Sequence, residues 1–273
     1  MCGVWIFLSL WTYHTPVSWA WTEATWHTKQ LPTAIYSRMW YVGALLQLRQ
    51  FMKIEIWSDF VCPFCYIGKA NLLQALQELN ITDAEIVWRS FELDPSFPQE
   101  NNTSHYQLLQ DKYQLDLQAA VDKCAQLAHI GSSCGLEMNF AQAYYGNTFL
   151  AHQLQQLAQA KSAQMAAQIN QALFHASFTL GLPLNQTDTL VSLAAENGLD
   201  AEEVRSALND KRYATAVRVD ETAAQELNIT AVPFFGFDGR LAVAGAQSID
   251  AFKEVIQHIL THDAADDAKM LRQ

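Results

Sequence analysis

A pair of cysteines marks the boundary between a strand-like run and a helix-like run, within Ser58-Asp59-Phe60-Val61-Cys62-Pro63-Phe64-Cys65-Tyr66-Ile67-Gly68-Lys69. Residues 53–57 before it read as a strand, and the leucines after it follow a helical period. A helix start presents unpaired N–H groups and the positive end of the macrodipole, and both favour an anion. We therefore expect Cys62 to react as a thiolate, Pro63 to occupy the first helical position, and Cys65 to lie within disulfide reach of Cys62.

The cysteine count favours redox chemistry at this pair. The five cysteines (Cys2, Cys62, Cys65, Cys124 and Cys134) are too few for the disulfide scaffold of a chain this long. A zinc site would need a second Cys-x-x-Cys, or a histidine pair at zinc-finger spacing after Cys65, and the sequence has neither. Inert core thiols are the remaining interpretation, but a proline between two cysteines at a helix start is an unusual way to fill a core. For Cys124 we predict a buried free thiol, with a regulatory disulfide to Cys134 as the alternative.

Charge and hydropathy exclude two classes of partner. The formal net charge of -11 disfavours binding to a nucleic-acid backbone. No apolar run reaches the roughly 18 residues that a membrane-spanning helix needs, so we expect no stable membrane insertion. At 273 residues the chain is long enough for one large domain or two small ones.

Residues 1–51 differ from the rest of the chain, because they hold six of the eight tryptophans and a single acid, Glu23. We interpret them as an extension outside the folded domain, with Met52 as the natural first residue. A secretory signal in residues 1–20 is the first alternative, although no lysine or arginine precedes Lys29. A membrane-surface anchor is the second. An extension outside the folded domain predicts a cytoplasmic protein, and a secretory signal in residues 1–20 predicts export to the periplasm.

From Met52 the pattern becomes regular. Strand, helix and strand over residues 53–57, 63–79 and 85–91 form a βαβ unit, whose strands should be parallel. Helical periods dominate residues 106–227, without a convincing strand. A strand over 229–237, a hairpin turn at Asp238-Gly239, a strand over 240–244 and a helix over 249–260 complete the chain. We expect a thioredoxin-like domain over 52–97 and 213–262, a helical insertion domain over 98–212, and a tail over 263–273.

This arrangement resembles the thioredoxin fold with a large all-helical insertion, an α/β fold found in the DsbA family. Cys62-Pro63-Phe64-Cys65 after the first strand and Ala231-Val232-Pro233 before the third carry the resemblance. It is closest to the FrnE branch, through the cysteine stretch, Phe91-Glu92-Leu93, Asn147-Thr148 with Ala151-His152, and Val232-Pro233-Phe234-Phe235 with Gly245-Ala246-Gln247. The 2-hydroxychromene-2-carboxylate isomerases and kappa-class glutathione transferases are relatives of this fold.

The resemblance implies a role for individual residues. Cys62 matches an exposed attacking cysteine, Cys65 a buried resolving cysteine, and Pro233 a cis-proline facing both. The backbone of Val232 would then be free to pair with an extended substrate. Pro63 and Phe64, between the cysteines, would tune the site and contact substrate, with Phe64 exposed. Two further residues, Asn147 and His152, would line the substrate groove; their alternatives are a helix N-cap and a helix surface. The position of Asp59 near the end of the first strand, and not the resemblance, predicts that it tunes Cys65 or takes protons during resolution; the alternative is an acid that stabilises a turn.

The predicted function is thiol–disulfide exchange, with isomerase activity as an extension of it. The predicted partners are protein or peptide disulfides and thiols, with glutathione as a co-substrate. We expect no tightly bound cofactor and no metal, and the sequence predicts no oligomeric state. The first alternative is a glutathione-dependent isomerase or transferase, whose motif typically begins with serine where this chain has Cys62. The second is a redox-inactive, chaperone-like binding module.

Overall fold

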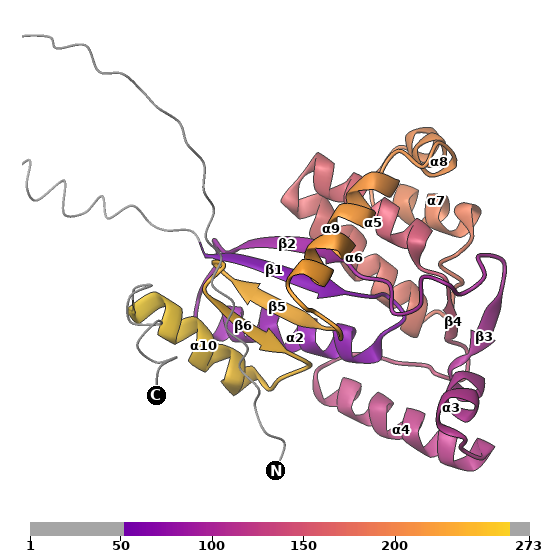
Figure 1. Ribbon diagram of the computed structural model, residues 1–273, viewed down its shortest axis with the longest axis horizontal. Coiled ribbons are helices and arrows are strands. Elements are labelled where there is room, and N and C mark those ends of the chain that lie inside the picture. Colours follow the sequence, from indigo (N-terminus) through magenta and orange to yellow (C-terminus); the bar gives the residue numbers. More distant parts are fainter. Residues whose placement is uncertain (1–51, 263–273) are drawn as a thin grey trace, which may run out of the picture.

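The computed structural model of the chain describes residues 52–262 (Figure 1). The predicted extension over 1–51 and the predicted tail over 263–273 lie outside this range. Within it, a small mixed sheet with flanking helices is joined to a larger block of helices (Figure 1). The predicted thioredoxin-like fold with a large helical insertion is thereby confirmed.

The sheet is assembled from both ends of the described chain. Its strands follow the order β2-β1-β5-β6. Their bounds are Lys53–Ser58 for β1, Glu85–Ser90 for β2, Phe234–Phe237 for β5 and Leu241–Ala244 for β6. The first two strands are parallel, with Ile54 opposite Ile86, and α2 (Pro63–Glu78) connects them, so the predicted βαβ unit is present. β5 runs antiparallel to β1 and β6 antiparallel to β5, which brings the C-terminal strands beside the N-terminal one.

Successive side chains of β1 point to opposite faces of the sheet, and each face packs against its own helices. Ile54 and Ile56 point to the face covered by α2 and by α10 (Ile249–Thr261), where they join a buried cluster with Phe252. Trp57 points to the other face and packs in a second cluster with Ala224 of α9 (Ala214–Glu226). Figure 1 shows α2 and α10 on one side of the sheet and α9 on the other. Helices on both faces remove the apolar surface of the sheet from water.

The helical block lies between β2 and β5 in sequence. Its helices are α3 (His105–Tyr113), α4 (Leu117–Ser133), α5 (Phe149–Lys161), α6 (Ala163–Phe178), α7 (Thr187–Glu196) and α8 (Ala201–Asn209). Side-chain caps define several starts: Ser162 accepts from the N–H of Met165, and Asp200 accepts from the N–H of Glu203. A hydroxyl or carboxylate at this position satisfies N–H groups that a helix start leaves free.

The insertion is not all-helical, which corrects the prediction. Two three-residue strands, β3 (Asn102–Ser104) and β4 (Tyr144–Gly146), pair antiparallel with Thr103 opposite Tyr145. Each is too short to show an alternating pattern, and Asn102 and Gly146 have low strand propensity. The pairing depends on contacts between segments about forty residues apart, so it leaves no local signal.

The strand predicted over residues 229–237 is also shorter than expected, since β5 begins at Phe234. Pro233 has no N–H to donate to a ladder. The pairing with β1 ends at Trp57 opposite Phe234, one residue before β1 itself ends. The residues before Pro233 therefore lead into the sheet without belonging to it.

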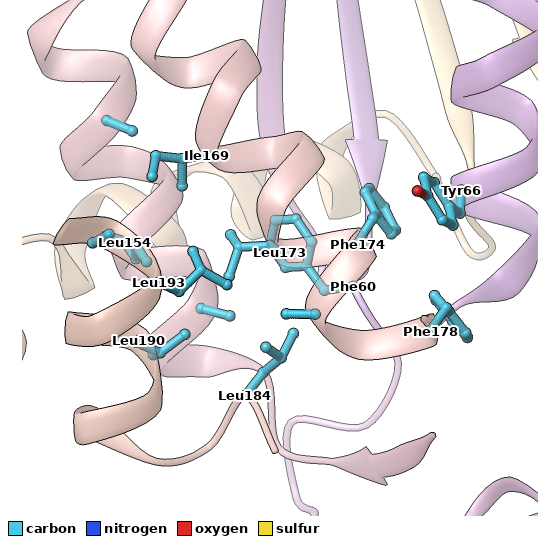
Figure 2. Close-up of a cluster of buried hydrophobic side chains, with 14 of the residues drawn as sticks. Phe60, Tyr66, Leu154, Ile169, Leu173, Phe174, Phe178, Leu184, Leu190 and Leu193 are labelled. Carbon is cyan, nitrogen blue, oxygen red and sulfur yellow. The ribbon is translucent and has the colours of Figure 1, made fainter. Parts of the chain in front are cut away.

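The largest buried cluster joins the cysteine helix to the helical block. Phe60 and Tyr66, on either side of the cysteines, pack against Phe174 of α6, with ring centroids 5.1 and 5.0 Å away. Figure 2 shows Tyr66 beside Phe174 and Phe178, and Phe60 beside Leu173. The start of α2 is thus held between two layers, so the helical block contributes directly to the surroundings of the cysteines.

Candidate active site

Cys62 and Cys65 lie at the junction of β1 and α2, as the sequence predicts. Cys62 is the N-cap of α2, with an extended backbone (φ -95, ψ 110), and Pro63 follows in the first helical turn. The N–H of Cys65 donates to the carbonyl of Cys62 at 3.0 Å, which closes the first turn. Both thiols are free, and the first turn contains no acidic side chain. An anion at Cys62 would therefore meet the positive end of the helix without a competing carboxylate in that turn.

Cys62 is more buried than the resemblance implied. Its relative exposure is 6%, against 1% for Cys65, so the expectation of an exposed attacking cysteine needs correction. Two parts of the same chain cover Cys62. The carbonyl oxygen of Val232 lies 3.8 Å from Cys62 Sγ, and the helical block packs around both cysteines. Cys62 is nevertheless the more accessible of the two sulfurs. Phe64 between them is 47% exposed, as expected.

The Val232–Pro233 segment faces the cysteines from the other half of the sheet. Its peptide bond is cis. A Cβ added to Gly68 of α2 would lie 3.1 Å from Pro233 Cγ and 3.3 Å from the Cα of Ala246, so the absence of a side chain there permits the close approach. Residues 62, 65, 232 and 233, predicted to form one site, are thus brought together by the fold.

Asn147 and His152, predicted to line a groove, are both buried. Asn147 donates to the carbonyl of Phe97 at 3.0 Å and accepts from the N–H of Phe149 at 3.0 Å, so it ties a loop to the start of α5. The ring of His152 packs 5.0 Å from the ring of Phe60. Its Nε2 lies 3.5 Å from Oδ1 of Asp59. His152, only 1% exposed, is therefore neither a surface residue nor open to a groove.

The pKa of Cys65 differs from that of a solvated thiol. Burial raises the pKa of Cys65 well above its ordinary value, and the hydrogen bond with Cys62 raises it further. The N–H of Asp59 donates to Cys65 Sγ at 3.5 Å and lowers this pKa, whereas the charge of the Asp59 carboxylate raises it. Cys65 therefore holds its proton strongly in the reduced site.

Some polar residues near the site were not found from the sequence. Burial, and then the charges of Asp59, Asp94 and Cys62, raise the pKa of Tyr145 on β4. Glu92 is buried just after β2 and accepts from Arg218 of α9 at 2.6 Å. The two residues belong to segments remote in sequence from the cysteines, and no spacing rule connects them. For Glu92, the sequence offered one indication, which is that Phe91-Glu92-Leu93 is among the motifs that carry the family resemblance.

A comparison with protein families identifies the chain. The model of the DSBA-like thioredoxin domain matches residues 53–257. The chain belongs to this family. The predicted DsbA-family resemblance is thereby confirmed, and the matched range includes both cysteines and Pro233.

Two individual proteins are similar to this chain over most of its length. The uncharacterized protein YwbO of Bacillus subtilis (strain 168) is 31% identical over 207 residues, which cover 75% of this chain and 96% of that protein. The probable DsbA oxidoreductase SCO1869 from Streptomyces coelicolor is 35% identical in a structural match with a TM-score of 0.73, covering 78% of this chain and 91% of that one.

A more distant DsbA-like structure supports the fold alone. The cytosolic disulfide reductase DsbM from Pseudomonas aeruginosa, solved with glutathione, is 16% identical with a TM-score of 0.55. The match covers 77% of this chain and 100% of DsbM. Across residues 52–262, no helix is long and apolar enough to cross a membrane.

Proposed function

We propose that this chain is a thiol–disulfide oxidoreductase in which Cys62 attacks and Cys65 resolves. The observation that supports it most is the pair of free thiols at the start of α2, with the Val232 carbonyl oxygen 3.8 Å from Cys62 Sγ. The 35% identical probable DsbA oxidoreductase SCO1869 supports the same class of chemistry. A retained second cysteine also favours redox work over isomerisation of a bound small molecule, which needs no resolving thiol.

The reaction follows from thiol chemistry. The Cys62 thiolate bonds to one sulfur of a substrate disulfide, the substrate S–S bond breaks, and the other substrate sulfur leaves as a thiolate. Cys65 then loses its proton and attacks Cys62 Sγ. The mixed disulfide breaks, the second substrate thiolate leaves, and a Cys62–Cys65 disulfide remains. Two enzyme thiols are oxidised and one substrate disulfide is reduced, and the reverse sequence donates a disulfide.

The surroundings of Cys62 favour an extended peptide as substrate. The half-buried Val232 precedes Pro233 at the site and offers backbone groups to a strand laid beside it. Phe64, 47% exposed, offers an aromatic contact next to the reacting sulfur. We propose glutathione as the small-thiol co-substrate, an idea motivated by the glutathione in the DsbM structure.

Cysteine variants test the proposal. We expect Cys62→Ser to lower insulin reduction, driven by glutathione or by dithiothreitol, by at least about a hundredfold, because a serine hydroxyl is not ionised at neutral pH. Cys65→Ser should accumulate a mixed disulfide at Cys62, visible by mass spectrometry of the intact protein. Cys134→Ser is the matched control, since this half-buried thiol lies on the helical block, and it should keep wild-type activity.

Three further assays distinguish the rival functions. Full cellular activity of Cys62→Ser would indicate a binding module that does not use its cysteines. Conjugation of glutathione to an aryl halide, without insulin reduction, would indicate a glutathione transferase. Reactivation of a protein with scrambled disulfides measures the isomerase activity, which uses the same attack by Cys62 without net oxidation.

A further inference from the structure

Two acidic side chains share one arginine nitrogen beside the loop that follows β2. Nη1 of Arg218 on α9 donates to Oε2 of Glu92 at 2.6 Å and to Oε2 of Glu221 at 2.5 Å. The guanidinium group also packs over the ring of Phe149 on α5, with its central carbon 4.3 Å from the ring centroid. The two carboxyl groups are therefore neighbours around a single nitrogen atom whose position is fixed by two helices.

The other oxygens of the two acids lack a donor. Oε1 of Glu92 and Oε1 of Glu221 are both buried, and within residues 52–262 neither accepts a hydrogen bond. Glu92 is 6% exposed. Asp220, which precedes Glu221 on α9, is bound to donors of β2 instead. Two ionised carboxylates here would bring two negative charges to one positive charge and leave buried acceptors unpaired. A proton on one of them removes a charge and supplies the missing donor.

The surrounding groups agree with a proton held at this pair. Burial raises the pKa of Glu92, the charge of His152 and the hydrogen bond with Arg218 lower it, and the hydrogen bond and charge of Glu221 raise it again. The net change is upward. His152 on α5 lies against a second acid, because its Nε2 is 3.5 Å from Oδ1 of Asp59. The nearby cations therefore do not outweigh the burial of the two carboxyl groups.

The loop that carries Glu92 is tied to the cysteine site by hydrogen bonds. The N–H of the next residue, Leu93, donates to Oδ2 of Asp59 at 2.7 Å. The N–H of Asp59 in turn contacts Cys65 Sγ at 3.5 Å. Because Glu92 is anchored on Arg218, the position of the Leu93 amide depends on the contacts between this loop and α9. A change in those contacts therefore reaches the surroundings of the buried sulfur through two hydrogen bonds.

We propose that Glu92 and Glu221 hold one proton between them, and that this pair, with Arg218, is a pH-sensitive clamp on the loop beside the cysteines. When the proton leaves, the two carboxylates repel each other, so the loop is held less tightly against α9. Glu92 and Arg218 are positioning residues, because neither contacts a reacting sulfur atom. The clamp makes the surroundings of Cys65 depend on pH, and this consequence for the reaction rests on the proposed function.

Carbon NMR of the full chain, labelled at the glutamate side-chain carboxyl carbons, tests the shared proton directly. Glu92→Gln and Glu221→Gln assign the two signals. In the wild type we expect the pair to titrate in two separated steps, the upper one above the pH at which the exposed Glu202 titrates. In each single variant the upper step should disappear, because glutamine supplies a donor to the remaining carboxylate without a second charge. Glu202→Gln on α8 is the matched control and should leave both steps in place.

Two further measurements follow the loss of the proton. The stabilisation by the protonated pair is complete below the pKa of an unfolded glutamate and is lost as pH rises through the folded pKa. The urea midpoint of Glu92→Gln should therefore increase relative to wild type over this range, whereas Glu202→Gln should follow wild type. Hydrogen exchange of the Leu93 amide, corrected for its intrinsic rate, should become faster over the same range in wild type but not in Glu92→Gln.

Two results would overturn the inference. Titration of both carboxyl groups together with Glu202 would show that they share no proton. A shared proton whose loss leaves the exchange of the Leu93 amide unchanged would show that the pair does not hold the loop. If Glu92→Gln does not fold, Glu221→Gln provides the same comparison. Failure of the proposed function looks different, because Cys62→Ser abolishes disulfide exchange but should leave the carboxyl titration and the amide exchange as in wild type.

Discussion

At the scale of single residues, Lys69 is the most unusual cation of the described chain. It lies one turn beyond Cys65 on α2 and is 3% exposed. Its Nζ donates to Asn170 Oδ1 at 3.0 Å and to Gln171 Oε1 at 2.8 Å, so its direct hydrogen-bond partners are neutral amides. Three aromatic rings surround it at 5.0–5.8 Å, those of Tyr66, Trp88 and Phe174. Burial lowers the pKa of Lys69 to about 7.

This pKa predicts a pH-dependent stability. Between about pH 7 and about pH 10.5 the unfolded lysine binds a proton that the folded one lacks, so folding costs more as pH falls. We expect Lys69→Met to be most favourable relative to wild type at about pH 7 and below, where the folded wild type must bury the charged ammonium group. The difference should change by about 1.4 kcal/mol per pH unit across this window. Urea unfolding at several pH values measures it, with the exposed Lys123→Met on α4 as control. Parallel curves for wild type and Lys69→Met would contradict the prediction.

At the scale of elements, two helices end in the same backbone conformation under different crowding. Gly181 follows α6 with φ +63, and Gly135 follows α4 with φ +73. A Cβ on Gly181 would meet the backbone of Gln142, whose carbonyl carbon would lie 2.7 Å away. A Cβ on Gly135 would meet nothing within 4 Å. The end of α6 is therefore fixed by a tertiary contact, and the end of α4 by its own geometry.

The two glycines predict different costs of substitution. Gly135→Ala should lower the free energy of unfolding by about 1 kcal/mol, because only the left-handed backbone is strained. Gly181→Ala should lower it by about 2–4 kcal/mol, because the Gln142 backbone must also move. Midpoints of urea unfolding at constant slope compare them. Equal losses would show that the contact with Gln142 relaxes without cost.

At the scale of the whole molecule, Asp220 joins the sheet to the helices. It is 3% exposed on α9, and its carboxylate accepts from Arg89 Nη1 at 2.8 Å, from the N–H of Ser90 at 2.9 Å and from Gln156 Nε2 at 2.6 Å. Its carbonyl accepts from the indole of Trp57 at 3.2 Å. One residue thus bridges β1, β2, α5 and α9, and α9 also carries Arg218 and Glu221.

This junction predicts a large effect of a small substitution. Asp220→Asn replaces one accepting oxygen by an NH₂ group that faces the donors of Arg89, Ser90 and Gln156, and it removes a negative charge beside Arg89. The substitution should therefore lower the free energy of unfolding by about 3 kcal/mol. Asp188→Asn is the matched control. That carboxylate also binds an arginine, Arg205, at 2.6 Å, but its side chain is 85% exposed, so it should lose less than about 1 kcal/mol. Chemical denaturation of both variants tests the contrast, and similar losses would argue against the junction.

Local chemistry was enough to predict the cysteine helix, the βαβ unit and the Asp238-Gly239 turn. A proline at the first helical position, an Asp-Gly turn and a period of apolar residues each act within a few residues, so the sequence displays them. The meeting of Cys62 with Pro233 was predicted only through the family resemblance, because 171 positions separate them.

Tertiary packing decided the rest. Cys62 is covered because Val232 and the helical block close over it, and β3 pairs with β4 across a long insertion. Asp59 and His152, which are 93 positions apart in the sequence, meet in a buried contact. No short-range rule of spacing encodes these contacts, since each depends on how α5, α9 and the sheet are packed. The amino-acid sequence by itself therefore determined which atoms react, and only the folded chain decided how exposed they are and which buried groups surround them.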